Sequence, residues 1–458
     1  NIDLDSLHQT CKQKGLSILG TGDVTQPDWR KYLQENLTYE NEVYSYKDVS
    51  FIVQTELEDS DSIHHVVLLP DLRAAEVLQE KLSPKVKNIT GKWAGRPHAH
   101  IGPAEIVEIV EDVGGICGPA HAFTPFKAVF RQGRYATLEE AYGTAAKKLA
   151  FLELGLSADT DLADRMESLE DITYLSNSDA HSEKSYSLGR EFNRIALEEP
   201  SFDEIKKAMF RRKGRKVTLN VGLDPHLGKY HVMFCNKCRR RVQKTVGNEE
   251  NDKSWKHFPN SGEAKGNGLN KYLENSGSTK NSKVGNKNFL YALNFTEDFL
   301  QYDFPTQKDY NNFLHHTEQK NVECVACKKK ILSKKKKSKR TRKIPHLRLG
   351  VSERINQIST WDEPHYPDHR PEYIDIIPLV DILRKIKGIK SKNSKTVNRA
   401  FEKAVKEYGT EYELLVDVNT KDFADFLDGK LSEIIHAFRN KKIKYVSGGG
   451  GTFGSIQL

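Results

Sequence analysis

Histidines and carboxylates stand at the ends of several short apolar runs in the first half of this sequence. The residues in these positions are Asp23, Glu56, His121, Glu153, Asp179 and His181. Imidazole and carboxylate ligands without cysteine suit Zn, Mn, Fe or Mg in a hydrolytic site better than a structural zinc site. Several such ions close together generate hydroxide near neutral pH and hold a phosphate during its displacement, so the set predicts phosphoester hydrolysis.

His64 and His65 stand at the start of an apolar run instead of at its end. The polar stretch 58–62 just before them is typical of a tight turn, and a hairpin brings the start of a second strand beside the end of the first. Both histidines are therefore expected near Glu56. The sequence alone does not decide which of the two rings faces it.

The elements that must position these side chains alternate between short apolar strands and longer stretches with helical spacing, a pattern typical of an α/β domain. In a barrel the ends of the strands meet on one face, which would bring residues that are distant in sequence together. The predicted strands are 16–19, 49–53, 66–69, 115–117, 149–152 and 172–175. The predicted helices between them are 74–82, 103–110 and 138–150.

The second half of the chain changes in composition. The 458 residues predict two or three domains, with boundaries at 1–228, 229–343 and 344–458. The segment 239–320 is rich in Asn, Lys, Gly and Ser and has no sustained periodicity, which indicates a flexible insertion and a candidate docking element for a protein partner. The last domain contains two amphipathic helix candidates, 398–408 and 420–439, before a glycine run at 448–451.

Four of the six cysteines form two Cys-x-x-Cys pairs, a pattern that favours metal binding in a reducing compartment over disulfides. Each pair can supply two thiolates to one tetrahedral structural zinc. The pairs are Cys235 with Cys238 and Cys324 with Cys327. The long separation between them adds little to the free energy of loop closure, which grows only logarithmically with length.

The charge and hydropathy of the chain favour an intracellular, non-secreted protein that contacts a polyanion. The sequence contains no apolar run near the roughly 20 residues that span a bilayer, and no export signal. The net charge of +8 is modest, but two basic runs are candidates for contacts with DNA phosphates. The residues chosen from these runs are Arg211, Arg212, Lys213, Arg340 and Arg342.

A series of motifs surrounds these residues, and its order and spacing resemble those of the endonuclease Q family. Members of this family are DNA endonucleases of the polymerase-and-histidinol-phosphatase (PHP) type. The resemblance covers residues 1–228 well and 344–458 more loosely. The motifs are Leu19-Gly20-Thr21-Gly22-Asp23, Gln54-Thr55-Glu56, His64-His65-Val66-Val67, Pro119-Ala120-His121-Ala122-Phe123-Thr124-Pro125 and Leu175-Ser176-Asn177-Ser178-Asp179-Ala180-His181-Ser182.

The resemblance implies a distorted seven-stranded PHP barrel, a small zinc-binding module with a long insertion and a mostly helical C-terminal DNA-binding region. It implies two or three divalent ions in the barrel (Zn, Mn, Mg or Fe) and cleavage of DNA on the 5′ side of deoxyinosine, deoxyuridine or abasic sites. The implied catalytic residues are Asp179, His181 and Glu56. The implied metal ligands are Asp23, Glu56, His65, His121, Glu153, Asp179 and His181, with His64 as the second choice for His65.

Two features depart from the family pattern. The family begins with a His-x-His pair, which would lie upstream of Asn1, and Gln26 stands where the family often has histidine. Two other functions remain open from sequence: a small-molecule phosphatase on the same barrel, and a nuclease subunit that works with an ATPase partner and has little lesion specificity. The basic runs and the cysteine module disfavour the phosphatase, and the insertion is the main support for the partner-dependent nuclease.

Overall fold

The computed structural model describes residues 2–86, 88–89, 96–239, 327, 332–337 and 340–457. Two compact units emerge, and each is described by itself. The first contains residues 1–225, 363–444 and 457–458, and the second contains residues 226–362 and 445–456. The three predicted domain boundaries remain a prediction.

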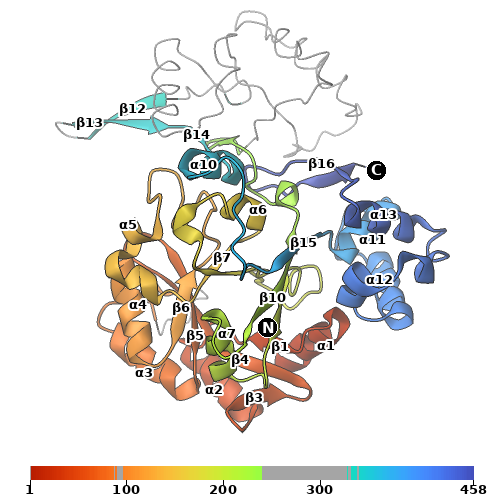
Figure 1. Cartoon of the computed structure of the whole chain (residues 1–458), viewed down its shortest axis with the longest axis horizontal. Coiled ribbons are helices and arrows are strands. Elements are labelled where there is room, and N and C mark those ends of the chain that lie inside the picture. Colours follow the sequence, from red (N-terminus) through yellow and green to blue (C-terminus); the bar gives the residue numbers. More distant parts are fainter. Residues whose placement is uncertain are drawn as a thin grey trace, which may run out of the picture. The chain divides into compact units, whose positions relative to one another are not determined.

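The largest sheet of the first unit carries Glu56 on β4 and both His64 and His65 on β5, and Figure 1 shows how its strands are arranged. Its strands run in the order β2-β3-β4-β5-β6, with β1 parallel to β4. The hairpin of β4 and β5 is the one expected from the polar stretch 58–62, and it pairs Glu58 with His64. The strands are β1 (Ile18–Gly20), β2 (Thr38–Glu40), β3 (Val43–Tyr46), β4 (Val49–Glu58), β5 (His64–Leu69) and β6 (Ile116–Pro119).

Two smaller sheets complete the strand structure of the first unit. β7 and β8 pair in parallel, and β10 lies between antiparallel β9 and parallel β15. The strands are β7 (Phe151–Glu153), β8 (Thr173–Leu175), β9 (Phe192–Ala196), β10 (Lys216–Leu223) and β15 (Glu372–Ile376). The prediction of a mixed α/β fold is confirmed, although the described residues contain no closed ring of paired strands.

One apolar cluster joins these sheets. Buried side chains from β4, β5, β6, β7, β8 and β10 pack with one face of α7, whose apolar residues recur at helical spacing. Backbone hydrogen bonds from Ala150 to Cys117 (3.0 Å) and from Ala122 to Glu153 (2.9 Å) connect the ends of β6 and β7. The strand ends that carry candidate ligands are therefore held by a shared core.

Helices of the first unit precede or follow these strands and begin at side-chain caps such as Asp3, Asp71 and Ser201. They are α1 (Leu4–Lys14), α2 (Pro27–Asn36), α3 (Leu72–Leu82), α4 (Pro103–Asp112), α5 (Leu138–Tyr142), α6 (Thr160–Ala163) and α7 (Phe202–Met209). The single helix predicted over 138–150 is wrong beyond Tyr142, because Gly143 takes a positive φ of 55° and a 3₁₀ turn follows at Gly143–Lys148.

Three helices in the C-terminal part of the first unit are α11 (Leu379–Ile386), α12 (Lys395–Tyr408) and α13 (Lys430–Arg439). The continuous helix predicted over 420–439 is also wrong, because Leu427, Asp428 and Gly429 adopt positive φ values and separate a short 3₁₀ turn, Thr420–Phe423, from α13. Lys14 at the end of α1 forms a fully buried ion pair with Glu411 (Nζ to Oε2, 2.5 Å). This pair ties the helical part to the N-terminal part of the unit.

The described residues of the second unit form short strands and one α-helix. β11 (Phe234–Cys235) pairs with β14 (Leu347–Arg348), β12 (Leu332–Lys337) with β13 (Arg340–Pro345), and β16 (Lys444–Val446) with β17 (Ser455–Gln457). The helix is α10 (Val351–Ile358). No helix in the described part of the chain is long and apolar enough to span a membrane.

The glycine run 448–451 is packed closely within the second unit. A side chain at Gly450 would lie 1.7 Å from the Arg239 carbonyl oxygen, and one at Gly448 would lie 2.0 Å from that of Gly228. The backbone N–H groups of Gly448, Gly449 and Gly451 already donate to protein carbonyls. These three amides are therefore engaged within the protein, and the glycines serve close backbone packing.

A buried carboxyl in β15 predicts a pH-dependent stability. Burial, with the charges of Asp159 and Asp224, raises the pKa of Asp375 to about 8, and its Oδ1 has no hydrogen-bond partner. Since the unfolded pKa is about 3.9, the folded protein loses stability as pH rises from about 4 to about 8. Asp375→Asn is therefore expected to be more stable than the parent, by on the order of a few kcal/mol at pH 9 and much less at pH 4. Thermal melts across this range check the trend, which a constant difference would contradict.

Candidate active site

Three candidate ligand side chains, one glutamate and two histidines, converge at the β4–β5 hairpin and the turn after β6. Glu56 Oε1 lies 3.0 Å from His64 Nδ1 and 3.7 Å from His121 Nε2, and the two imidazole nitrogens lie 3.1 Å apart. One ligand atom from each residue falls within 4.8 Å of the others. This spacing allows a single cation to contact all three side chains, so the donor set fits the divalent metal predicted from sequence.

His64 reaches this group and His65 does not. Successive side chains of a strand point to opposite faces, so only one of the two histidines can face Glu56. His65 is fully buried on the other face, where its Nε2 lies 3.0 Å from Asp59 Oδ2 and its ring contacts Tyr142 edge to face. Of the two histidines left open by the sequence, His64 is therefore the one placed as a candidate ligand beside Glu56.

Glu153, the last residue of β7, lies against the same group. Its Oε2 accepts the backbone N–H of His121 (2.8 Å) and its Oε1 accepts the side-chain amide of Asn177 (2.9 Å). Burial, together with the negative charges of Asp179 and Glu56, raises the pKa of Glu153 to about 7, although the charge of His121 opposes this rise. A carboxyl crowded by other acidic groups in this way is typical of a site that holds cations.

Asp23 and Asp179 lie in the turns that follow β1 and β8. Partial burial and the charge of Glu56 raise the pKa of Asp23, whose charge also interacts with His181. His181 is exposed, and its Nε2 lies 3.6 Å from Asp179 Oδ1. Asp23, His121 and Asp179 all have positive φ values, between 32° and 44°. Such strained backbone concentrates at functional sites.

The two histidines of the group have opposite electrostatic surroundings. Burial lowers the pKa of His64, a shift only partly offset by Glu56. Burial would also lower the pKa of His121, but Glu56, Asp179 and Glu153 outweigh it and raise this pKa. Burial opposes ionisation of Glu56, yet hydrogen bonds from His121 and His64 hold its pKa well below its usual range. The carboxylate is thus ionised and ready to bind a cation.

Arg96 is a functional-site residue that sequence reasoning missed. Its Nη2 donates to Glu56 Oε2 (2.6 Å) and its Nη1 lies 3.4 Å from His64 Nε2. Arg96 does not follow a predicted apolar strand in the sequence, so the strand-end pattern could not find it. The neighbouring His98 also reaches this region, since its Nδ1 lies 3.6 Å from Glu58 Oε1.

This geometry belongs to a chain with clear relatives. A crystal structure of the lesion-specific endonuclease PfuEndoQ from Pyrococcus furiosus matches it with a TM-score of 0.73 and 30% sequence identity, covering 99% of this chain and 90% of that one. The chain belongs to the endonuclease Q family. A structure of endonuclease Q in complex with a 27-mer duplex substrate carrying an abasic lesion at the active site matches with a TM-score of 0.74 and 29% identity, over 99% and 91% of the two chains.

Curated relatives extend the endonuclease Q family comparison. An uncharacterised protein of Methanocaldococcus jannaschii, MJ0043, is 30% identical over 75% of this chain, which spans only about a third (32%) of that protein's length. The uncharacterised YqxK of Bacillus subtilis is 25% identical over 98% of this chain and 91% of its own. Residues 378–442 match the family described as the MJ0043 C-terminal domain. The predicted family is confirmed, and with it the predicted enzyme class, hydrolases that act on phosphodiester bonds.

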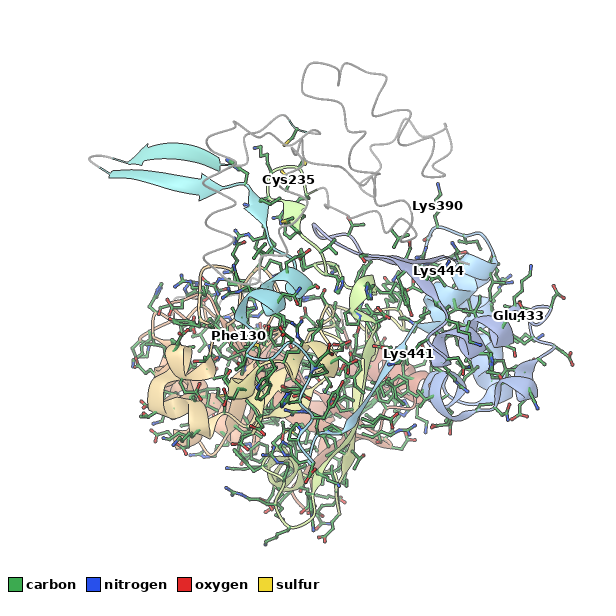
Figure 2. The ribbon with its side chains drawn as sticks, turned by 45° about the horizontal axis from the view of Figure 1, so that its top comes forward. Phe130, Cys235, Lys390, Glu433, Lys441 and Lys444 are labelled. Carbon is green, nitrogen blue, oxygen red and sulfur yellow. The ribbon has the colours of Figure 1, made fainter. Side chains whose placement is uncertain are left out.

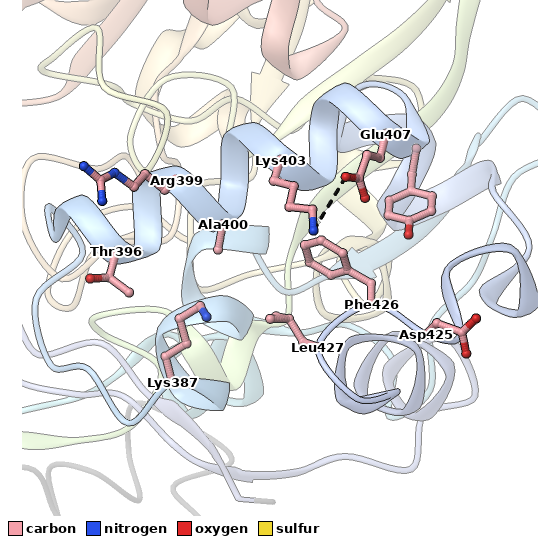
Figure 3. A pocket seen from close by; sticks show the side chains of 10 residues that line it. Lys387, Thr396, Arg399, Ala400, Lys403, Glu407, Asp425, Phe426 and Leu427 are labelled. Carbon is pink, nitrogen blue, oxygen red and sulfur yellow. Dashed lines mark ion pairs between the residues drawn. The ribbon is translucent and has the colours of Figure 1, made fainter.

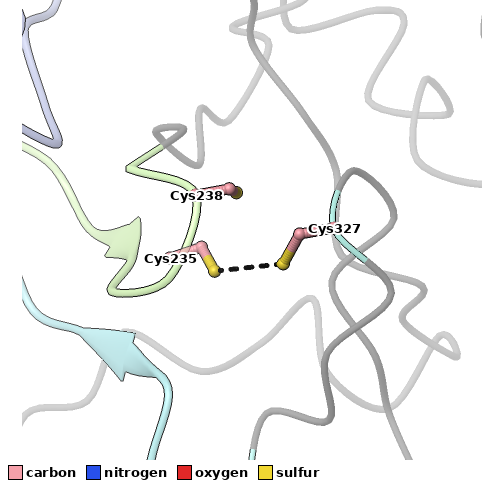
Figure 4. A group of neighbouring side chains, drawn as sticks. All are labelled: Cys235, Cys238 and Cys327. Carbon is pink, nitrogen blue, oxygen red and sulfur yellow. Dashed lines mark hydrogen bonds between the residues drawn. The ribbon is translucent and has the colours of Figure 1, made fainter.

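A second candidate metal site of this endonuclease Q family chain lies in the second unit (Figure 4). Cys235, Cys238 and Cys327 form a group whose sulfur atoms all lie within 4.8 Å, with 3.8 Å between the Cys235 and Cys327 sulfurs. Cysteines from both Cys-x-x-Cys pairs therefore lie together, although the long insertion separates the pairs in the sequence. Cys324 lies outside the described residues.

The predicted DNA-contacting residues differ in their surroundings. Arg211 donates to Thr173 Oγ1 and to the Asp171 carbonyl oxygen (2.7 Å each), which fits a structural role. Arg212 and Lys213 are exposed, and the Arg212 guanidinium lies 5.1 Å from the centre of the Phe210 ring. Arg340 and Arg342 lie on β13, opposite Lys337 and Lys335 of β12. The hairpin of β12 and β13 therefore concentrates basic residues from two adjacent strands.

Sequence reasoning also missed a basic pocket of about 490 Å³ beside α12 (Figure 3). Lys387, Arg399 and Lys403 line it together with the ring of Phe426, which lies 5.7 Å from Lys403 Nζ. Among the described residues, the side chains of Lys387 and Arg399 have no hydrogen-bond or ion-pair partner. Lys390, Lys441 and Lys444 add exposed positive charge to the same C-terminal part of the first unit (Figure 2). The side chains of Lys387 and Arg399 are available to an external anion, whereas Lys403 is paired with Glu407 (3.7 Å), and Asp425 also lines the pocket.

Proposed function

We propose that this chain is a metal-dependent DNA endonuclease that hydrolyses the backbone on the 5′ side of deaminated bases, such as deoxyinosine and deoxyuridine, or of abasic sites. The observation that carries the proposal is the convergence of Glu56, His64 and His121 in a member of the endonuclease Q family. The solved relatives support DNA as the substrate, because one of them is a complex with a lesion-bearing duplex.

Two or three divalent ions (Zn, Mn, Mg or Fe) are proposed at this site. One ion would be held by Glu56, His64 and His121. The other proposed ligands of these ions are Glu153, Asp23, Asp179 and His181. When bound, such ions supply Lewis acidity and hydroxide at neutral pH. The seven-stranded barrel implied by the family would bring these ligands to one face, and the shared apolar core and the links between β6 and β7 support that arrangement.

The chain's own residues account for the remaining requirements of the reaction. Glu56, Asp179 and His181 are the proposed catalytic residues. Arg96, which already donates to Glu56, is placed to offer its guanidinium to an anionic group that approaches the same carboxylate. A lesion unpairs more easily than a normal base, which favours its extrusion from the duplex toward the site.

Structural zinc in the second unit is part of the proposal. Cys235, Cys238, Cys324 and Cys327 would hold one ion, and the proximity of the three described thiols supports this. The described cysteines form no disulfide, in keeping with the proposed intracellular location. Cys327→Ser is expected to lower the zinc content by one ion per chain, and elemental analysis measures it. Cys11→Ser, in the first unit, is the control; unchanged zinc in Cys327→Ser would show that the pairs do not share an ion.

Basic residues outside the metal centre are proposed to hold DNA phosphates. Arg212, Lys213, Arg340 and Arg342 are candidates from sequence, with Arg211 in a mainly structural role. The cations of the basic pocket add a further contact. Because phosphate contacts release counterions, affinity should fall as salt rises. A protein partner at 239–320 remains a proposal, and nearly all of that segment lies outside the described residues.

A single cleavage experiment tests the proposal. End-labelled duplexes that carry deoxyinosine, deoxyuridine, an abasic site or no lesion are incubated with the chain in Mg²⁺ or Mn²⁺, with and without chelator. Nicks are expected 5′ of each lesion, little cutting of intact duplex is expected, and chelator should stop the reaction. Equal cutting of intact DNA would remove the lesion specificity but keep the nuclease.

Two other outcomes distinguish the remaining alternatives. Hydrolysis of small phosphomonoesters with no cutting of DNA would favour the phosphatase. No cutting of any duplex by the metal-loaded chain would overturn the stand-alone endonuclease and favour a partner-dependent nuclease.

A further inference from the structure

We infer that Asn193, on β9, is a positioning residue that fixes the orientation of Glu153 through Asn177. This inference rests on the proposed metal-dependent function, because Glu153 is one of the proposed ligands. None of the asparagines involved is a candidate ligand. Their side chains form a chain of hydrogen bonds that runs from the buried strand β10 to the metal-site carboxylate.

The inner end of this chain is Asn177. Its Nδ2 donates to Glu153 Oε1 (2.9 Å), while its Oδ1 accepts from Asn193 Nδ2 (3.0 Å). An asparagine amide carries a donor on one side and an acceptor on the other. Asn177 can therefore present its NH₂ group to Glu153 only while a donor faces its carbonyl oxygen, and Asn193 is that donor.

Asn193 is itself held in one orientation. Its Oδ1 accepts the backbone N–H of Ser176 (2.8 Å) and Nδ2 of Asn220 (2.8 Å), and its Nδ2 also donates to the Ser176 carbonyl oxygen (3.2 Å). A rotation of its amide by 180° would place acceptor against acceptor at Ser176 and donor against donor at Asn220. The amide of Asn193 is thus fixed by contacts on both sides.

Asn220 anchors the outer end. It is fully buried in β10, directly opposite Asn193 in the strand register, and its Nδ2 also donates to the Tyr174 carbonyl oxygen (3.1 Å). Tyr174 belongs to β8, the strand that pairs with β7 and so with Glu153. The network therefore connects three strands to one carboxylate.

The other oxygen of Glu153 accepts the backbone N–H of His121, so both carboxylate oxygens are already directed before a metal binds. Groups that orient metal ligands in this way typically contribute about 10- to 100-fold to metal affinity or activity. A substitution of Asn193 would reverse the amide of Asn177 that faces Glu153, and it would do so without changing any proposed metal ligand.

Asn193→Asp tests this inference. Aspartate keeps the shape and still accepts from Ser176 and Asn220, but it cannot donate to Asn177. The Asn177 amide would then rotate to donate to the new carboxylate, and its oxygen would face Glu153. We expect the affinity for Mn²⁺, measured by calorimetry and by the electron paramagnetic resonance spectrum of the bound ion, to fall about 10- to 100-fold. Zinc at the proposed cysteine site should change little, and the thermal midpoint at saturating Mn²⁺ measures separately the stability lost because aspartate cannot donate to the Ser176 carbonyl oxygen.

Two further variants separate orientation from charge and from stability. Asn193→Leu removes the same donor without adding charge and should also weaken Mn²⁺ binding. Asn440→Asp adds the same charge at an exposed position and should bind Mn²⁺ like the parent. Parent-like Mn²⁺ affinity in both Asn193 variants would overturn the inference and leave the proposed function standing. Failure of the parent to bind Mn²⁺ would overturn both.

Discussion

Substitution of His64 by alanine is expected to lower the rate of lesion cleavage at least about 1,000-fold, which is about 4 kcal/mol in activation free energy at 1.36 kcal/mol per tenfold. His64 lies within 3.1 Å of both Glu56 and His121, so its loss removes a third of the donor set that can contact one cation. Cleavage of a deoxyinosine duplex at saturating Mn²⁺, with Mn²⁺ binding measured on the same protein, checks the expectation.

His65 is the matched control, because it neighbours His64 in sequence but faces the opposite side of β5. His65→Asn should retain cleavage in the folded protein, while loss of the buried contact with Asp59 lowers the free energy of unfolding by about 1–3 kcal/mol. Urea unfolding measures this cost. If His65→Asn were folded but inactive and His64→Ala were active, the assignment of the metal ligand would return to His65.

Loss of the buried pair of Lys14 and Glu411 should have a large effect on stability. Both side chains are at most 1% exposed, and removal of one partner leaves the other charge buried and uncompensated. Lys14→Met is therefore expected to lower the free energy of unfolding by about 3–5 kcal/mol. Glu411→Gln should cost about as much, although glutamine keeps an oxygen that can accept the Leu379 N–H.

A double-mutant cycle measures this coupling by chemical denaturation. The combined Lys14→Met, Glu411→Gln protein should recover much of the loss, since no unpaired charge remains. The exposed pair Lys31–Glu35, at 3.8 Å, is the control, and Lys31→Met should change stability by less than about 1 kcal/mol. Additive losses in the cycle would contradict a direct interaction between Lys14 and Glu411.

Much of the fold around the site could be predicted from local sequence. Asp23, His121 and Asp179 were found because each follows a short apolar run, and the structure places each just after β1, β6 or β8. The hairpin before His64 was predicted from the polar stretch that precedes it. Such signals are local: hydrophobic periodicity and turn residues are set by neighbours within a few positions.

The elements that were mispredicted depended on backbone conformations that apolar spacing does not encode. The helix expected over 138–150 changes to a 3₁₀ turn at Gly143, and that expected over 420–439 is interrupted at residues 427–429. β9 and β10 were not predicted at all, although Asn193 and Asn220 on these strands direct Glu153. Polar residues within these strands weakened the apolar pattern that would have revealed them.

By itself, the sequence determined the family and the mixed α/β class and proposed the donor types of the site, because these depend on residue identity and on spacing along the chain. Only the tertiary structure decided between His64 and His65, brought Arg96 to Glu56 and buried Lys14 against Glu411. Each of these depends on which face of an element points toward its partner, and for Arg96 and Lys14 that partner is distant in sequence. Strand register and helix packing fix that choice, and they are properties of the whole folded unit rather than of any local segment.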